Sequence, residues 1–385
     1  MDIHPVIYLD YNATTPVAPE VVNEMLPFFL SAYGNASSND HLLGWQAKDA
    51  VDQARSSFAH QFGIGKNEII FTSGATEAIN LLLRGLLINN NASKTHIITV
   101  ETEHSAVLGT CEVLLKNGLE VEYLPVNEQG IISLERLEKS IRGNTQLVSI
   151  MMVNNETGVL QPMKEIGEIC KRKNVLFMSD TTQAIGKIDF RPIDYGIDIM
   201  VGSAHKFYGP KGVGFLYARK EILDKVEPLI TGGGQEGAKR GGTTNVPAIV
   251  GMAKALELNL SQLESESKRI RGLQISFEEH LVSELPIIVH AKEGNRMYNV
   301  SNICFKGIDS ERLMQKIGGK VAASRGSACS SAGARASHVL SAMGVSHDDA
   351  LSSVRFSFGR FTSEDDLEKA IDIIVRSIKS LSVGV

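Results

Sequence analysis

The 385-residue chain lacks several features that would place it in a specialised class of proteins. It has no apolar run near the roughly 20 residues that a membrane-spanning helix requires, so we expect no membrane partner. It has no block of basic residues, and its net charge of −5 argues against a nucleic-acid partner. Its first residues lack a basic region followed by an apolar one, which predicts that no signal peptide is present.

Cysteine is also scarce, and the four cysteines form no CxxC pair. Such scattering is typical of a cytoplasmic protein with reduced thiols. Cys111 and Cys170 fall in helical patterns and Cys304 in a strand-like run, so we expect all three to be buried small hydrophobic residues. Cys329 differs because only Gly, Ser and Ala occur within three positions of it. That composition indicates an exposed thiol on a mobile loop, although an incidental loop cysteine fits the residues equally well.

What the chain does contain is a regular alternation of apolar strands and helices from about residue 65 to 220. This order predicts an α/β fold with a mainly parallel sheet that is flanked by helices on both faces. The length exceeds one typical core, so we expect two domains or one large domain with an appendage. The large domain is predicted to span residues 15–262. Residues 1–14 and 263–385 are predicted to form a smaller α+β domain.

The N-terminal segment begins with a short apolar run, Tyr8-Leu9, that leads into a polar turn ending at Pro16. A helix is predicted to follow, with Val21, Val22, Met25 and Phe29 on its apolar side. We expect this side to face the core.

Polar side chains gather where the predicted strands end. The carboxyl ends of parallel strands meet at one edge of a sheet, where ligands collect. The strand over residues 69–72 runs into small and hydroxyl residues that open a helix, and such a helix start can bind an anion or remain an ordinary N-cap. The side chains delivered to this edge are Thr76, His104, Asn155, Asp180, Gln183, Ser203, His205 and Lys206.

Lys206 is the most informative of these residues because it follows a buried strand and precedes the rigid turn at Gly209-Pro210. A lysine held there and partly desolvated can be a neutral amine that condenses with an aldehyde, although a lone lysine is more often a surface residue. Pyridoxal phosphate needs such a lysine, an anion site, and a carboxylate that keeps its pyridine nitrogen protonated. Asp180 suits the last role; as an alternative it caps a helix.

Arg355 lies in an alternating strand near the C-terminus, between apolar neighbours. A buried guanidinium needs a partner, which is either a substrate carboxylate or a carboxylate of the protein.

Four motifs occur in order along the chain: Thr-Ser-Gly-Ala-Thr-Glu (72–77), Val-Asn-Asn-Glu-Thr-Gly (153–158), Asp-Thr-Thr-Gln-Ala (180–184) and Ser-Ala-His-Lys-Phe-Tyr-Gly-Pro-Lys-Gly (203–212). With them, nearly the whole chain resembles the pyridoxal-phosphate cysteine desulfurases of the NifS/IscS type. These belong to the class V branch of the fold type I pyridoxal-phosphate transferases.

The resemblance implies a role for each residue of the predicted site. Lys206 would hold pyridoxal phosphate as an imine and move protons. His104 would stack on the ring and act as an acid or base, and Asp180 would pair with the pyridine nitrogen. Gln183 and Asn155 would lie near the ring hydroxyl. The phosphate would be bound by Ala75, Thr76, Ser203, His205 and, from a partner subunit, Thr243.

The same resemblance implies a homodimer that converts L-cysteine to L-alanine. Arg355 and Asn155 would bind the substrate, and Cys329 would receive its sulfur as a persulfide. A sulfur-acceptor protein would then serve iron–sulfur cluster assembly or tRNA or DNA sulfur modification. Two alternatives remain: a selenocysteine lyase or other class V enzyme in which Cys329 is incidental, and a non-catalytic partner of sulfur-transfer proteins.

Overall fold

The computed structural model describes residues 6–87, 95–325 and 336–382. Its centre is a seven-stranded sheet in the order β2-β8-β7-β6-β5-β3-β4. Strands β3 to β7 pair in parallel, whereas β8 is antiparallel to both β2 and β7. The strands are β2 (Ile69–Thr72), β3 (His96–Val100), β4 (Glu120–Leu124), β5 (Thr145–Ser149), β6 (Leu176–Asp180), β7 (Ile199–Ser203) and β8 (Gly214–Ala218). The predicted α/β fold with a mainly parallel sheet is therefore confirmed.

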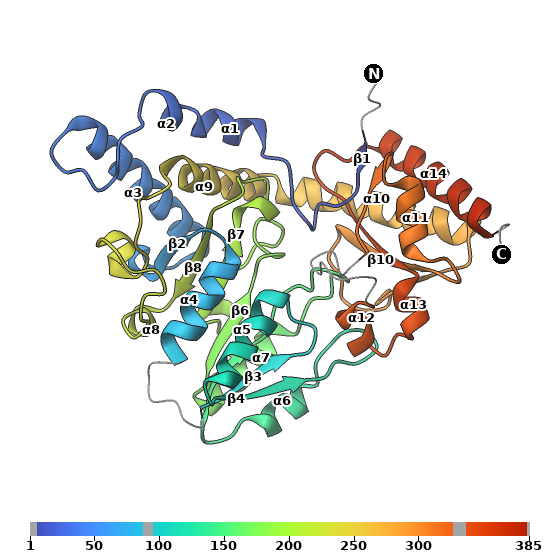
Figure 1. The fold of residues 1–385 in the computed structure, drawn as a ribbon, viewed down its shortest axis with the longest axis horizontal. Helices are drawn as coiled ribbons and strands as arrows, with labels where there is room; N and C mark the ends of the chain where they lie inside the picture. The colour runs from blue at the N-terminus through green and yellow to red at the C-terminus, as the bar shows by residue number, and fades with distance from the viewer. Residues whose placement is uncertain (1–5, 88–94, 326–335, 383–385) are drawn as a thin grey trace.

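Helices cover both faces of this sheet, which explains why its inner strands are buried almost throughout (Figure 1). One face packs against α4 (Ala75–Leu87) and α5 (Ser105–Lys116). The other packs against α3 (Leu42–Phe62), α7 (Met163–Lys173) and α9 (Val246–Ser261). Shorter helices complete this part of the chain: α1 (Pro19–Met25), α2 (Pro27–Leu30), α6 (Leu134–Ser140) and α8 (Lys220–Leu223).

A second apolar core lies in the C-terminal part, where a smaller sheet has the order β12-β10-β9 and is antiparallel. Its strands are β9 (Ile287–Val289), β10 (Val300–Phe305) and β12 (Ser353–Ser357). The N-terminal strand β1 (Ile7–Tyr8) joins this part by pairing in parallel with β11 (Val321–Ala322). The helices are α10 (Leu263–Glu284), α11 (Ser310–Ile317), α12 (His338–Ala342), α13 (His347–Leu351) and α14 (Glu364–Ser382).

The buried residues of this second core all come from the segments assigned to the small domain. Tyr11, however, packs into the core of the large sheet, although the sequence places it before the boundary at residue 15. The exact domain boundaries therefore stay a prediction.

The N-terminal helices differ from the expectation. Val21 is buried, but Val22 and Phe29 are 45% and 59% exposed. Pro27 starts a separate short helix, so the predicted apolar side does not form one continuous inner face.

Candidate active site

A cavity of about 590 Å³ lies at the carboxyl edge of the large sheet. It collects side chains from the ends of β2, β3, β6 and β7, as predicted for strands that are mostly parallel. The predicted residues that line it are Ala75, Thr76, His104, Asn155, Asp180, Gln183, Ser203, His205, Lys206 and Arg355. Residues 326–335, and with them Cys329, lie outside the described part of the chain.

Lys206 follows β7 in a single 3-10 turn over Ala204–Lys206. Its Nζ donates hydrogen bonds to the backbone carbonyls of Asn12 and Ala13, at 2.8 and 2.6 Å. These carbonyls hold the amine at the cavity wall, so Lys206 is not a mobile surface lysine. Sequence reasoning missed Asn12 and Ala13 because they act through backbone atoms; the polar turn that contains them was the only signal.

Asp180 and His104 each cap a local turn and also face the cavity. The Asp180 Oδ1 accepts a hydrogen bond from the Thr182 backbone N–H at 2.9 Å, and the His104 Nδ1 accepts one from the Ala106 N–H at 3.1 Å. Burial lowers the pKa of His104, Asp180 opposes this shift, and Lys206 adds to it. The lowered pKa favours the neutral form of the ring. Asp180 therefore caps a turn and not a helix, and His104 caps the start of α5, while both side chains still line the cavity.

The start of α4 also lines the cavity. Its first turn carries Ala75 and Thr76, and the first backbone N–H groups of a helix have no partner within the helix. A Cβ on Gly74 would lie 3.4 Å from the Ser203 Oγ, an ordinary van der Waals contact. Burial, followed by the charges of Lys206, Lys211 and Lys187, lowers the pKa of His205 to about 4. A neutral imidazole and free N–H groups suit a phosphate.

Arg355 reaches the cavity from β12. Its Nη2 forms an ion pair with Asp10 at 2.8 Å, and its Nη1 donates to the Asn155 carbonyl at 3.0 Å. The protein carboxylate considered as an alternative partner is thus Asp10, which sequence reasoning did not identify. The Arg355 Nε is buried without a partner among the described residues. Binding of a substrate carboxylate by Arg355 stays a prediction.

The residues present fit pyridoxal phosphate. The cavity brings together a held lysine, a carboxylate on Asp180 and a helix start that can take an anion. The Thr182 Oγ1 is also buried at this edge without a partner in the described chain, so a polar group remains to be satisfied there.

Among the described residues, one predicted site residue lies apart from this set. Thr243 does not line the cavity; it lines a neighbouring one of about 250 Å³ that shares Ser73 and Gly212 with it. That position is compatible with a contact from Thr243 to the site of another subunit. It does not test whether such a contact forms.

The other three cysteines are buried and free, as predicted. Burial raises the pKa of each thiol to about 12: Cys111, Cys170 and Cys304. A thiol with such a pKa carries almost no thiolate at neutral pH, so none of them is a good nucleophile.

In the described ranges, no group of three or more histidine, cysteine or acidic residues could hold a metal ion. None of the helices in those same ranges combines the length and apolar character that crossing a bilayer requires.

Comparison with known proteins agrees with this geometry. The chain is 43% identical over 376 residues to the cysteine desulfurase IscS of Rickettsia massiliae (strain Mtu5), covering 97% of this chain and 92% of that protein. The IscS of Rickettsia typhi (strain ATCC VR-144 / Wilmington) is 42% identical with the same coverage. A solved structure described as a NifS-like protein superposes with a TM-score of 0.92 at 36% identity, covering 98% of this chain and all of that one.

A solved structure of DndA from Streptomyces lividans has a TM-score of 0.76 at 34% identity, covering 90% of this chain and 97% of that chain. The profile of the family described as "Aminotransferase class-V" matches residues 7–370. The chain therefore belongs to the class-V aminotransferase family.

Proposed function

We propose that this chain is a pyridoxal-phosphate-dependent cysteine desulfurase, which releases L-alanine and retains the sulfur as a persulfide on Cys329. The observation that carries the proposal is a single cavity lined by Lys206, Asp180 and Arg355. The similarity to curated cysteine desulfurases over nearly the whole chain supports it.

In this proposal the cavity residues hold the cofactor from three sides. Lys206 would bind it covalently through Nζ, Asp180 would pair with its pyridine nitrogen, and His104 would pack against its ring. The start of α4 would hold its phosphate. When bound, pyridoxal phosphate supplies a ring that accepts the electron pair left when the α-proton of the substrate departs.

Arg355 binds the carboxylate of L-cysteine. Its buried Nε and its two Nη groups present donors in a planar fork that matches a carboxylate. Asp10 is the competing anion in the absence of substrate, because it pairs with the same guanidinium at 2.8 Å. The Asn155 side chain lines the cavity beside it.

Lys206 and His104 transfer protons in this proposal. The Lys206 Nζ takes the α-proton, and the neutral His104 imidazole exchanges a proton beside it. The Cys329 thiolate attacks the substrate sulfur, so an S–S bond forms while the Cβ–S bond breaks. The carbon then takes up a proton and becomes the methyl group of alanine. Atoms and electrons balance without an added oxidant.

Several finer assignments belong to the same proposal. The sulfur passes from Cys329 to an acceptor protein, in iron–sulfur cluster assembly or in tRNA or DNA sulfur modification, and the enzyme works in the cytoplasm. It acts as a homodimer in which Thr243 serves the site of the partner subunit. In support, exposed apolar side chains occur on α1, α2, the start of α3 and the links between them: Val22, Leu26, Phe29, Leu30, Tyr33, Leu42 and Trp45.

The test compares Cys329→Ser with the control Cys111→Ser. Cys329→Ser should keep the borohydride-reducible bond between Lys206 and the cofactor but lose the release of sulfide and alanine from L-cysteine. Cys111→Ser should keep both. Continued sulfide and alanine production by Cys329→Ser would refute the proposal. Measuring L-selenocysteine in parallel identifies the alternative lyase, which would retain activity toward that substrate in Cys329→Ser.

A further inference from the structure

Lys187 lies behind the cavity wall and belongs to no role described above. Its Nζ donates to the Gln183 Oε1 at 2.9 Å. The Gln183 Nε2 in turn donates to the Asn12 carbonyl at 3.0 Å, and the same carbonyl accepts from the Lys206 Nζ at 2.8 Å. Lys187 is thus connected to the cofactor lysine through a continuous chain of hydrogen bonds.

The first link of this chain fixes the orientation of Gln183. An amide side chain can turn over and exchange its oxygen and nitrogen, and only its hydrogen-bond partners decide between the two positions. The protonated Lys187 can only donate, so it requires the Gln183 oxygen on its own side. The Gln183 N–H groups are then directed toward Asn12 and the cavity.

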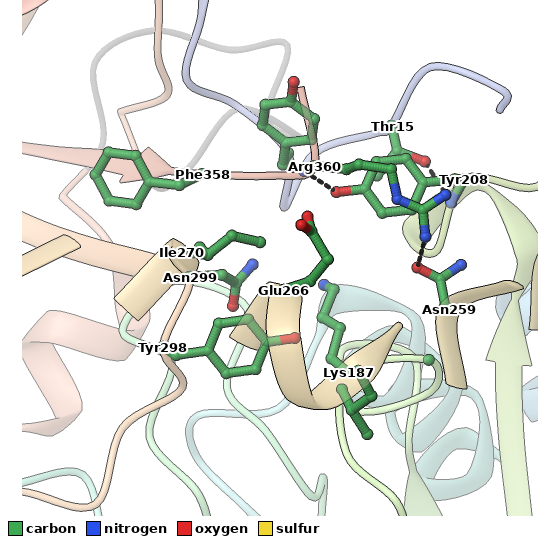
Figure 2. A pocket seen from close by; sticks show the side chains of 13 residues that line it. Thr15, Lys187, Tyr208, Asn259, Glu266, Ile270, Tyr298, Asn299, Phe358 and Arg360 are labelled. Carbon is green, nitrogen blue, oxygen red and sulfur yellow. Dashed lines mark hydrogen bonds between the residues drawn. The ribbon is translucent and has the colours of Figure 1, made fainter. Parts of the chain in front are cut away.

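On its other side, Lys187 borders a small cavity of about 30 Å³, which has room for about one water molecule. Figure 2 shows the Lys187 side chain extending toward Glu266, which comes from α10. Glu266 forms its ion pair with Arg269 at 3.0 Å, and no carboxylate of the described chain forms one with Lys187. Lys187 is only 9% exposed. Its charge is therefore buried and not neutralised by an adjacent anion.

The charged and titratable groups around Lys187 come from several elements. Burial, followed by the charges of Lys206 and Arg355, lowers the pKa of Lys187 to about 7. Repulsion between two cations acts on both of them, so a charge on Lys187 also disfavours a charge on Lys206. The other ionisable groups that line the small cavity are Glu266, Arg360, Tyr11, Tyr208 and Tyr298.

We propose that Lys187 is a positioning residue that fixes the Gln183 amide and, through its buried charge, disfavours protonation of the nitrogen by which Lys206 holds the cofactor. This inference rests on the proposed function, because it concerns the loaded enzyme. A deprotonated nitrogen at Lys206 is the form that can accept a proton from an incoming substrate amine.

The test is a pH titration of the visible absorbance of the holoenzyme, which reports protonation of that nitrogen. Lys187→Met removes both the charge and the donor and should move the midpoint upward by about 0.5–1 pH unit. Lys187→Gln keeps an N–H donor without the charge and should also move it upward. The control Lys171→Met removes an exposed lysine at the end of α7 and should leave the midpoint unchanged.

An unchanged or lowered midpoint in Lys187→Met overturns the inference, and if that variant does not fold, the same result in Lys187→Gln overturns it. Failure of the proposed function gives a different result, since the wild-type protein would then show no borohydride-trapped cofactor on Lys206.

Discussion

A few buried charged side chains control how the cavity binds its substrate and cofactor. Asp10 and Arg355 form one ion pair at the cavity wall, whereas Lys187 is a buried amine behind it whose pKa is lowered to about 7. Removing one of these charged groups changes the electrostatic environment of the others. The resulting change in substrate binding or pKa can be measured.

Asp10→Asn tests whether Asp10 competes with the substrate. The amide keeps the shape of the side chain but removes the negative charge that pairs with Arg355. We expect KM for L-cysteine to fall about threefold to tenfold, equivalent to about 1 kcal/mol, with little change in kcat. Steady-state kinetics measures both constants, with the exposed Asp189→Asn as the control. A raised KM would show instead that Asp10 is needed to position the guanidinium.

Lys187 predicts a pH dependence of stability. Its pKa is lowered to about 7 in the folded protein, whereas an unfolded lysine titrates near ~10.4. Between these values the unfolded chain binds more protons, so the stability of the folded apoprotein rises with pH. From pH ~7 to ~9, Tm of the wild type should therefore increase relative to Tm of Lys187→Met. Parallel pH profiles for the two proteins would contradict the assignment.

At the scale of elements, the site depends on how closely β8 packs against the start of α4. A Cβ on Gly214 would lie 2.4 Å from the Gly202 carbonyl oxygen and 2.6 Å from the Gly74 Cα. These are backbone atoms of the sheet and of the turn before α4, so neither can move cheaply.

Gly214→Ala should therefore destabilise the protein by about 1–3 kcal/mol and weaken cofactor binding. Thermal unfolding and a titration with pyridoxal phosphate measure the two effects. Gly109→Ala, in α5 where nothing lies within 4 Å of a new Cβ, should be neutral or stabilising. Equal stability of the two variants would show that the contact at Gly214 is not constrained.

The elements that the sequence predicted best are those with strong local signals. The apolar run before Lys206 and the small residues before α4 predict that Lys206 and the start of α4 lie at the sheet edge. The structure places both of them there. The exposure of Val22 and Phe29 could not be predicted, because helical periodicity shows that residues share a side but not what covers it. Asp10 and Lys187 were missed for a related reason: their partners come from tertiary packing, which leaves no local pattern.

The whole molecule is proposed to work as a dimer with shared sites, which subunit mixing tests. Lys206→Ala and Thr243→Ala homodimers should each be inactive or nearly so. In a mixed dimer, one site combines Lys206 of one subunit with Thr243 of the other, so activity should return to about half of the wild-type value. If mixing restores nothing although mixed dimers form, Thr243 acts within its own subunit.

The central claim is that Lys206 chemistry delivers sulfur to Cys329. Mass spectrometry of the enzyme after one equivalent of L-cysteine tests it most directly. We predict one added sulfur atom on the peptide that contains Cys329, and none in Lys206→Ala. Alanine formation with the sulfur on Cys111, Cys170 or Cys304, or with no sulfur on any cysteine, would contradict the claim.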